Sequence, residues 1–383
     1  MKKHLFLIFN FLVFSSVYSQ VTFVLDELPV NTPDSASVYI SGDFEGWTGG
    51  QGKYKFSNKN NTFFITLPKQ IGSINYKFTL GSWESVETNT QGRSIDNRSY
   101  IPKKENDTVR IKILGWSDQF SIKSTATKNI SILSENFYIP QSDRKRRIWI
   151  YVPPDYASTS KNYPVIYMHD GQNLFDESTS FSGEWEVDEI LNKIYTDKKL
   201  GFIVVGIENG GSKRMDEYSP WKNTKYGGGE GDAYVEFIVQ TLKPYVDENY
   251  RTYPNRNNTA IMGSSMGGLI SYYAALKYPN VFSKSGVFSP SFWFSEKSFD
   301  YAKENGNLKN SKMYFLAGNK EGDNVAFEEI SNTVKGVNKV SDLLKEAGFN
   351  ANYISTKIVA EGKHNEKFWR ENFEEAVLWL FDE

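Results

Sequence analysis

From residue 147 to the C-terminus, short apolar runs rich in β-branched residues alternate with stretches of helical periodicity. The strand-like runs lie at 147–152, 164–170, 202–208, 258–263, 284–289, 312–318 and 353–359. The longest helix-like stretch between them is 232–250. Strand–helix alternation of this kind gives a mostly parallel sheet covered by helices on both faces. The sequence therefore predicts an α/β domain, to which we assign residues 127–383.

The preceding residues have a different pattern. Between residue 21 and about residue 120, the chain has short β-rich segments separated by turn residues, with no sustained helical periodicity. These segments are 21–28, 37–44, 62–68, 74–80 and 108–114. The pattern predicts a small all-β sandwich over residues 21–120. The polar stretch 121–129, SIKSTATKN, is the predicted linker.

The first twenty residues are typical of a signal peptide. Lys2 and Lys3 form a basic start, residues 5–14 are apolar, and serines then offer a cleavage site before Gln20. The apolar stretch is too short for a stable membrane anchor. The sequence therefore predicts a periplasmic or secreted protein that is not bound to a membrane after cleavage.

Charge and cysteine content exclude several classes of function. Loss of two lysines with the signal peptide changes the formal net charge from −2 to about −4, which offers no footprint for nucleic acid. The chain has no cysteine, which excludes disulfides, a thiol nucleophile and cysteine–zinc sites. The histidines and carboxylates show no H-x-x-x-H or similar spacing, so neither a metal nor an organic cofactor is implied.

The segment Gly263–Gly267 reads G-S-S-M-G, which fits the pattern G-x-S-x-G. It follows a predicted buried strand and opens a predicted helix, which is where a nucleophile elbow lies. The alternative is a glycine-rich turn without chemistry. We expect Ser265 to be the nucleophile, held at the start of the helix where developing negative charge is stabilised.

A serine nucleophile needs a base, and the mature chain offers only His169 and His364. In α/β-hydrolases the order is serine, acid, histidine, which points to His364, although an exposed loop histidine is the alternative. His169 ends an early strand and is expected to brace the loop that follows. Glu321 and Asp323 both follow the strand before the last one, and we prefer Glu321 as the acid that orients the imidazole.

An oxyanion hole needs two backbone N–H groups. One is expected from Met266, the residue after the nucleophile. The other is expected from Gln172, because Gly171 lets the loop after the early strand turn its amides inward.

Several separated motifs resemble the enterochelin-esterase-like family, which includes the feruloyl and acetyl-xylan esterases of carbohydrate esterase family 1. They are HDGQNLFD (169–176), RMDEYSPW (214–221), LKPYVDENYRT (242–252), GSSMGG (263–268) and GKHNEKFW (362–369). The resemblance implies an esterase with an α/β-hydrolase fold. Ser265 and His364 stand where this family keeps its nucleophile and base. The acid varies within the family, so Glu321 and Asp323 both stay open.

The N-terminal region resembles starch- and glycogen-binding modules of the early-set type. The matching segments are SGDFEGW (41–47), YKF (76–78), GSWE (81–84) and NR (97–98). This implies that Trp47 and Trp83 stack on sugar rings, although Trp47 also fits a core position and Trp83 fits either role. Enterochelin esterases carry a similar sandwich that binds no glucan.

The leading functional hypothesis is an exported esterase that removes feruloyl or acetyl groups from polysaccharides. Trp221 and Trp293 are the aromatic residues expected to contact substrate there. One alternative is a siderophore trilactone esterase, for which Lys213 and Arg214 are the obvious basic pair. The other is a glycan-binding protein on an inactive hydrolase scaffold.

Overall fold

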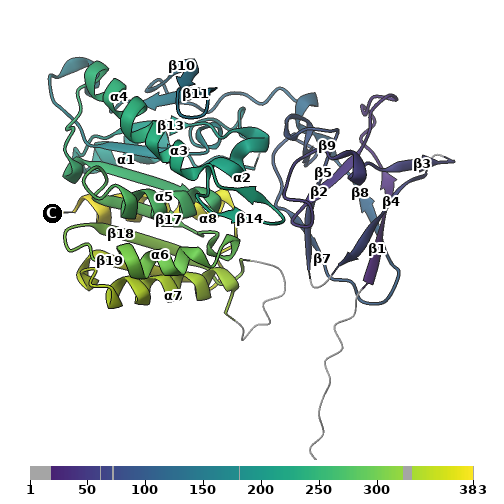
Figure 1. The fold of residues 1–383 in the computed structure, drawn as a ribbon. Helices are drawn as coiled ribbons and strands as arrows, with labels where there is room; N and C mark the ends of the chain where they lie inside the picture. Colours follow the sequence, from purple (N-terminus) through teal and green to yellow (C-terminus); the bar gives the residue numbers. More distant parts are fainter. Residues whose placement is uncertain (1–18, 61, 71–72, 181, 322–329, 383) are drawn as a thin grey trace, which may run out of the picture.

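The computed structural model describes residues 19–60, 62–70, 73–180, 182–321 and 330–382. The predicted signal peptide lies outside these ranges except for its last two residues, which begin the first strand. Within the described part of the chain, no helix is long and apolar enough to cross a membrane. Figure 1 shows a β-rich N-terminal part beside a larger part in which helices surround a sheet.

A mixed eight-stranded sheet forms the centre of the larger part, in the order β10-β11-β13-β12-β16-β17-β18-β19. The first two pairings are antiparallel, and every pairing from β13 to β19 is parallel. The strands are β10 (Ile130–Ile139), β11 (Arg144–Tyr151), β12 (Val165–His169), β13 (Ile203–Ile207), β16 (Thr259–Ser264), β17 (Lys284–Phe288), β18 (Lys312–Gly318) and β19 (Ile354–Val359). A short hairpin, β14 (Lys222–Asn223) with β15 (Gly227–Gly228), lies outside this sheet. This arrangement confirms the predicted mostly parallel α/β sheet.

Helices cover both faces of the sheet (Figure 1). One apolar cluster joins α1 and α8 to one face, and a second cluster joins α3 to α7 to the other. The helices are α1 (Val187–Lys198), α2 (Arg214–Glu217), α3 (Gly231–Phe237), α4 (Lys243–Asn249), α5 (Met266–Lys277), α6 (Lys297–Asn305), α7 (Asn332–Glu346) and α8 (Glu366–Phe381). Almost every side chain of α5 is buried, because this helix packs directly on β16 and β17.

Two details differ from the sequence-based expectation. The stretch 232–250 is not one helix but α3 and α4 joined by a π-helical turn at Ile238–Leu242. Pro244 in the first turn of α4 has no N–H to continue the α-helical ladder, which accounts for the wider turn before it. The edge strand β10 was not predicted, because its side chains are mostly exposed or half-buried and form no continuous apolar run.

The N-terminal part consists of small sheets around its own core. They have the orders β3-β4-β1-β8, β2-β5-β7 and β6-β9. The strands are β1 (Ser19–Glu27), β2 (Tyr39–Gly42), β3 (Ser57–Lys59), β4 (Thr62–Gln70), β5 (Ile74–Thr79), β6 (Glu87–Thr88), β7 (Arg98–Tyr100), β8 (Asp107–Lys112) and β9 (Gly115–Trp116). Phe23, Phe78 and Trp116 are fully buried in the core that these sheets share. The predicted all-β region is therefore present.

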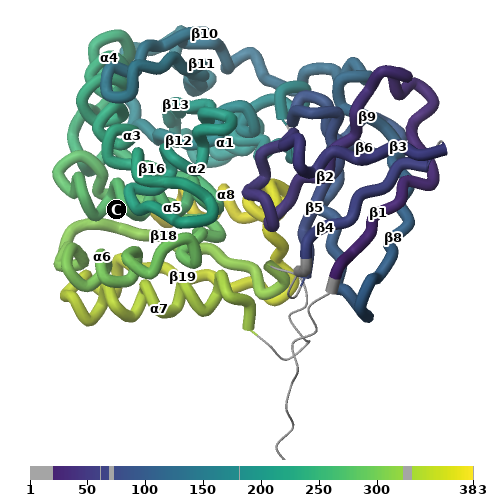
Figure 2. The backbone as a smooth tube through the Cα atoms, turned by 45° about the vertical axis from the view of Figure 1, so that its right-hand side comes forward, coloured from purple at the N-terminus to yellow at the C-terminus, as the bar shows by residue number. Residues whose placement is uncertain are grey.

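The two parts lie side by side in both views (Figures 1 and 2). Asn365 Nδ2 donates a hydrogen bond to Asp96 Oδ1 at 3.0 Å, and Tyr226 Oη donates to the carbonyl of Asp43 at 2.8 Å. The polar linker is also bound to the α/β part, since Ser124 Oγ donates to Asp176 Oδ2 at 2.6 Å. The linker is therefore an ordered part of the junction.

Candidate active site

Ser265 lies at a sharp turn between β16 and α5, with φ of 58° and ψ of −121°. Such a backbone conformation is strained for a residue with a side chain and is typical of a nucleophile elbow. Gly263 permits the turn, because a Cβ there would lie only 2.8 Å from the backbone of Gly267. The amide of Ser265 donates to the carbonyl of Phe288 at 2.9 Å, which fixes the turn against β17.

His364 and Glu321 form the other half of the site. His364 Nδ1 lies 2.9 Å from Glu321 Oε2. The second oxygen, Oε1, accepts hydrogen bonds from Ser289 Oγ and from the amide of Gly318, both at 2.6 Å. Glu321 is 3 % exposed, whereas the His364 side chain is 35 % exposed. The predicted alternative acid, Asp323, lies outside the described residues.

Ser289 and Trp369 extend this hydrogen-bond network. Trp369 Nε1 donates to Ser289 Oγ at 2.8 Å, and Ser289 Oγ in turn donates to Glu321. The ring of Trp369 also packs edge-to-face against the His364 imidazole, with centroids 5.2 Å apart. These two side chains therefore fix the acid and the histidine together.

Sequence reasoning did not identify Ser289 or Ser291 as part of the site. Ser291 is buried, its Oγ is 3.3 Å from Ser265 Oγ, and its amide donates to the carbonyl of Ser265 at 3.0 Å. Their position could have identified them, because both serines lie within three residues after the end of β17 and the carboxyl ends of parallel strands share one edge of a sheet.

The candidate oxyanion amides belong to the ends of two neighbouring strands. Met266 is the first residue of α5, after β16. Gln172 lies in a 3-10 turn at Gly171–Asn173 after β12, and β12 pairs with β16. The side chain of Gln172 accepts a hydrogen bond from the amide of Asn209 at 3.3 Å, which holds this turn.

His169 is a buried structural neighbour of the elbow. Its Nδ1 is 2.8 Å from Tyr234 Oη, and its ring lies 2.9 Å from the point where a Cβ on Gly263 would stand. Burial lowers the pKa of His169 to about 3, so the ring is neutral at physiological pH. This position suits the expected bracing role.

Lys213 and Arg214, the basic pair considered for binding a siderophore, already form ion pairs within the protein. Arg214 holds Asp170 in a two-pronged ion pair, with distances of 2.7 and 2.9 Å to its two oxygens. Lys213 Nζ lies 2.9 Å from Asp216 Oδ2. An anionic ligand would therefore have to compete with Asp170 for Arg214 and with Asp216 for Lys213.

The predicted aromatic contacts lie in three different settings. Trp293 is 55 % exposed and packs edge-to-face on Tyr226 at 5.5 Å. Trp221 is half-buried and packs edge-to-face on Tyr273 at 5.6 Å, within the main core. Trp47 and Trp83 are both half-buried and contact each other, with centroids 6.1 Å apart.

Trp83 Nε1 also donates to the carbonyl of Trp47 at 2.9 Å. Among the four predicted tryptophans, Trp293 is the most accessible, so it is the best placed to contact a ligand.

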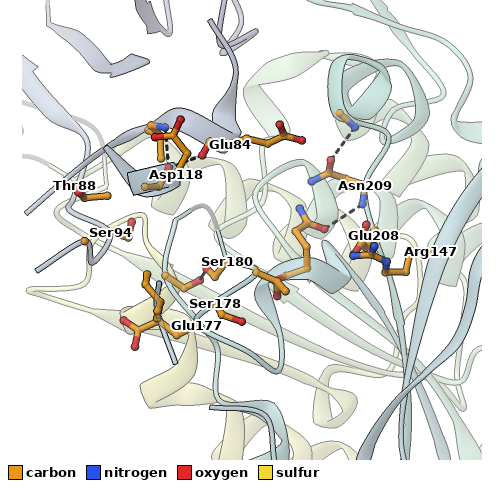
Figure 3. A pocket seen from close by; sticks show the side chains of 18 of the residues that line it. Glu84, Thr88, Ser94, Asp118, Arg147, Glu177, Ser178, Ser180, Glu208 and Asn209 are labelled. Carbon is orange, nitrogen blue, oxygen red and sulfur yellow. Dashed lines mark hydrogen bonds and ion pairs between the residues drawn. The ribbon is translucent and has the colours of Figure 1, made fainter. Parts of the chain in front are cut away.

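A cleft of about 680 Å³, with both polar and apolar walls, lies between the two parts of the chain. Figure 3 shows Glu84 and Asp118 on the N-terminal side, and Ser178, Ser180 and Asn209 on the other. Gln172 also lines this cleft. The cleft therefore leads to the turn that carries one candidate oxyanion amide.

A buried lysine of the N-terminal part also approaches this site. Lys77, on β5, is 3 % exposed, and burial lowers its pKa, while Glu366 at the start of α8 offsets part of that shift. Burial raises the pKa of Glu366 to about 8. Glu366 Oε1 accepts a hydrogen bond from Asn173 Nδ2 at 3.4 Å, beside the Gln172 turn. The N-terminal part thus places a buried ionisable side chain beside Glu366, close to the Gln172 turn.

Comparison with known proteins shows the family of the chain. A family model described as "Putative esterase" matches residues 139–380. The Bacillus subtilis protein YbbA, itself uncharacterised, is 28% identical over 243 residues, which is 62% of this chain and 92% of that protein. An endo-1,4-beta-xylanase/feruloyl esterase of Xylanibacter ruminicola is 25% identical over 368 residues, covering 92% of this chain and 44% of that protein.

Among solved structures, the enterobactin esterase of Shigella flexneri superposes with a TM-score of 0.54 at 15% identity, over 90% of this chain and 88% of that one. This likeness confirms the predicted α/β-hydrolase fold with a β-rich N-terminal region. Because the family model covers well over half of the chain, the protein belongs to this esterase family and is a carboxylic ester hydrolase.

Proposed function

We propose that the protein removes feruloyl or acetyl groups from polysaccharides through Ser265, His364 and Glu321. The observation that carries the proposal is the 2.9 Å pair of His364 Nδ1 and Glu321 Oε2, at the same sheet edge as the strained turn of Ser265. The three residues come in the chain order of an α/β-hydrolase triad. The comparisons support an esterase of this general type.

In the proposed mechanism, His364 Nε2 takes the proton of Ser265 Oγ as the oxygen attacks the ester carbonyl. The amides of Met266 and Gln172 donate to the oxyanion of the tetrahedral intermediate. His364 then returns the proton to the leaving sugar oxygen, which leaves an acyl group on Ser265. Water, deprotonated by the same imidazole, releases the acid and regenerates the serine.

Glu321 keeps the imidazole in the productive tautomer. Its Oε1 is occupied by Ser289 and Gly318, so Oε2 alone faces His364 Nδ1. A proton on Nδ1 leaves Nε2 free to accept the serine proton, and the carboxylate stabilises the imidazolium that follows. Burial of Glu321 strengthens this interaction, because little water screens it.

Two features support an ester-substituted polysaccharide as substrate. The xylanase/feruloyl esterase relative aligns with nearly the whole of this chain. The cleft beside Gln172 offers both hydrogen-bonding and apolar groups to a sugar chain, while the exposed Trp293 suits an aromatic acyl group. The predicted signal peptide would place the enzyme in the periplasm or outside the cell, where such substrates occur. The proposal includes stacking of glycan on Trp47 and Trp83.

A siderophore trilactone is the second candidate, because the Shigella enterobactin esterase shares the fold over most of both chains. Against it, Arg214 and Lys213 are held by Asp170 and Asp216. A panel of methyl ferulate, acetylated xylan, p-nitrophenyl acetate and ferric enterobactin separates the candidates. Higher kcat/KM for the first two supports our proposal, and a preference for ferric enterobactin overturns it. No turnover of any ester would point to an inactive glycan-binding scaffold.

A further inference from the structure

The start of α1 holds three carboxylates that the esterase mechanism does not use. One oxygen of each of Glu184, Asp188 and Glu189 lies within 4.8 Å of the others. Asp188 is fully buried and Glu184 is 6 % exposed. Like charges so close together and away from water repel strongly unless something compensates them.

Hydrogen bonds within the described residues compensate the cluster only in part. Thr125 Oγ1 lies 3.0 Å from both oxygens of Glu184, and the amide of Thr127 donates to Asp188 Oδ2 at 2.8 Å. Among the described residues no other side chain or amide donates to Asp188 Oδ1 or Glu189 Oε2, and the two carboxylates lie against each other. A buried carboxylate oxygen left without a donor costs on the order of 1–3 kcal/mol. The positive end of the α1 dipole offsets only part of this.

We propose that Glu184, Asp188 and Glu189 bind a divalent cation, with calcium as the preferred ion. Carboxylate oxygens are ligands for hard cations, and calcium tolerates the irregular geometry that magnesium does not. Calcium–oxygen bonds of about 2.3–2.6 Å put ligands on opposite sides of the ion at most about 5 Å apart. The observed limit of 4.8 Å fits inside that span.

The site would join the linker to the catalytic part of the chain. Thr125 and Thr127 of the linker already bond to two of the three carboxylates. Trp185 lies between Glu184 and Asp188 in the sequence. Its amide donates to the carbonyl of Asn173, in the turn that carries Gln172. A bound cation would therefore stiffen the junction and the turn beside the candidate oxyanion amide. Sequence analysis missed this site because it sought histidine-based spacings.

Calcium titration of the chelator-treated, full-length protein tests the proposal. We expect isothermal titration calorimetry to show one saturable site, and 1 mM calcium to raise the thermal midpoint by about 2 °C or more. Magnesium should give a smaller rise. Glu189→Gln and Asp188→Asn should each abolish the calcium-dependent rise in the thermal midpoint. If Asp188→Asn does not fold, Glu189→Gln alone provides the test.

Glu186→Gln is the matched control, because Glu186 lies within the same segment but pairs with Arg370. This variant should keep the full calcium response. The proposal is overturned if the wild-type protein shows no binding heat and the same midpoint with and without millimolar calcium. That result would mean that Asp188 and Glu189 share a proton instead. These readouts do not depend on ester hydrolysis, so they are independent of the proposed substrate.

Discussion

Glu321 Oε2 lies 2.9 Å from His364 Nδ1, while the other oxygen of the same carboxylate is fixed by Ser289 and Gly318. The carboxylate is therefore oriented from one side and acts on the histidine from the other. Its orientation does not depend on the histidine or on substrate.

Glu321→Gln is expected to reduce kcat by up to about 10⁴-fold, because the amide cannot hold Nδ1 protonated as the carboxylate does. Steady-state kinetics on p-nitrophenyl acetate measures the loss. Asp323→Asn, two residues later in the sequence, is the control and should change kcat little. The reverse pattern would reassign the acid to Asp323.

Trp369→Phe removes the donor to Ser289 Oγ and keeps most of the ring that packs on His364. We expect kcat to fall about 10-fold with KM unchanged, because the acid is held less firmly while ground-state binding is untouched. Trp379→Phe on the same helix, whose ring packs on Tyr314, should leave kcat unchanged. Equal effects of both substitutions would show a general packing defect in α8.

Protonation of His169 is expected to destabilise the protein in acid. Its folded pKa of about 3 is below the ordinary value of 6.5, so its contribution to stability is present above pH 6.5 and is lost as the pH falls toward 3. Between pH 7 and pH 4 this amounts to roughly 3 kcal/mol. Glu366 works in the opposite direction, because its pKa of about 8 makes folding less favourable as the pH rises.

Urea unfolding at pH 7 and pH 4, with the wild type and a His169 variant, measures the contribution of His169 to the loss of stability. The free energy of unfolding should fall less in His169→Gln than in the wild type, and His364→Gln should behave like the wild type. If His169→Gln and the wild type lose stability equally, His169 does not stay neutral in the fold.

Trp293→Ala is expected to raise KM for methyl ferulate about 2- to 10-fold, from the loss of one aromatic contact with the acyl group. KM for p-nitrophenyl acetate should not change, because an acetyl group is too small to use this contact. An equal change in KM for both substrates would show that Trp293 does not contact the acyl group. Trp221→Phe serves as a control for an aromatic residue packed in the core.

The parts of the fold that sequence could predict are those that burial dictates. Except for the edge strand β19, the parallel strands are almost fully buried and appear as apolar runs, and the elbow needs glycine at Gly263 for steric reasons. The edge strand β10 has no continuous apolar run, because most of its side chains are exposed or half-buried. The π turn before Pro244 depends on one missing N–H rather than on periodicity.

The expected roles of Ser265 and His364 rest on position, because each follows a strand and has a distinctive residue type. Our preference for Glu321 over Asp323 has less support from position, because two acids two residues apart follow the same strand. Ser289 was missed because its role comes from contacts with Trp369 and Glu321, which lie far away in the sequence. The approach of Lys77 to Glu366 likewise exists only once the two parts are packed together.

Covalent labelling tests the central claim, that Ser265 is the nucleophile. A fluorophosphonate reacts with a serine that a neighbouring base activates, and peptide mass spectrometry then identifies the modified residue. We predict one adduct per chain, on Ser265, with no labelling and a loss of several orders of magnitude in kcat for Ser265→Ala. Ser264→Ala should label and hydrolyse esters like the wild type. An adduct on Ser264 or Ser291, or full activity in Ser265→Ala, would contradict the account.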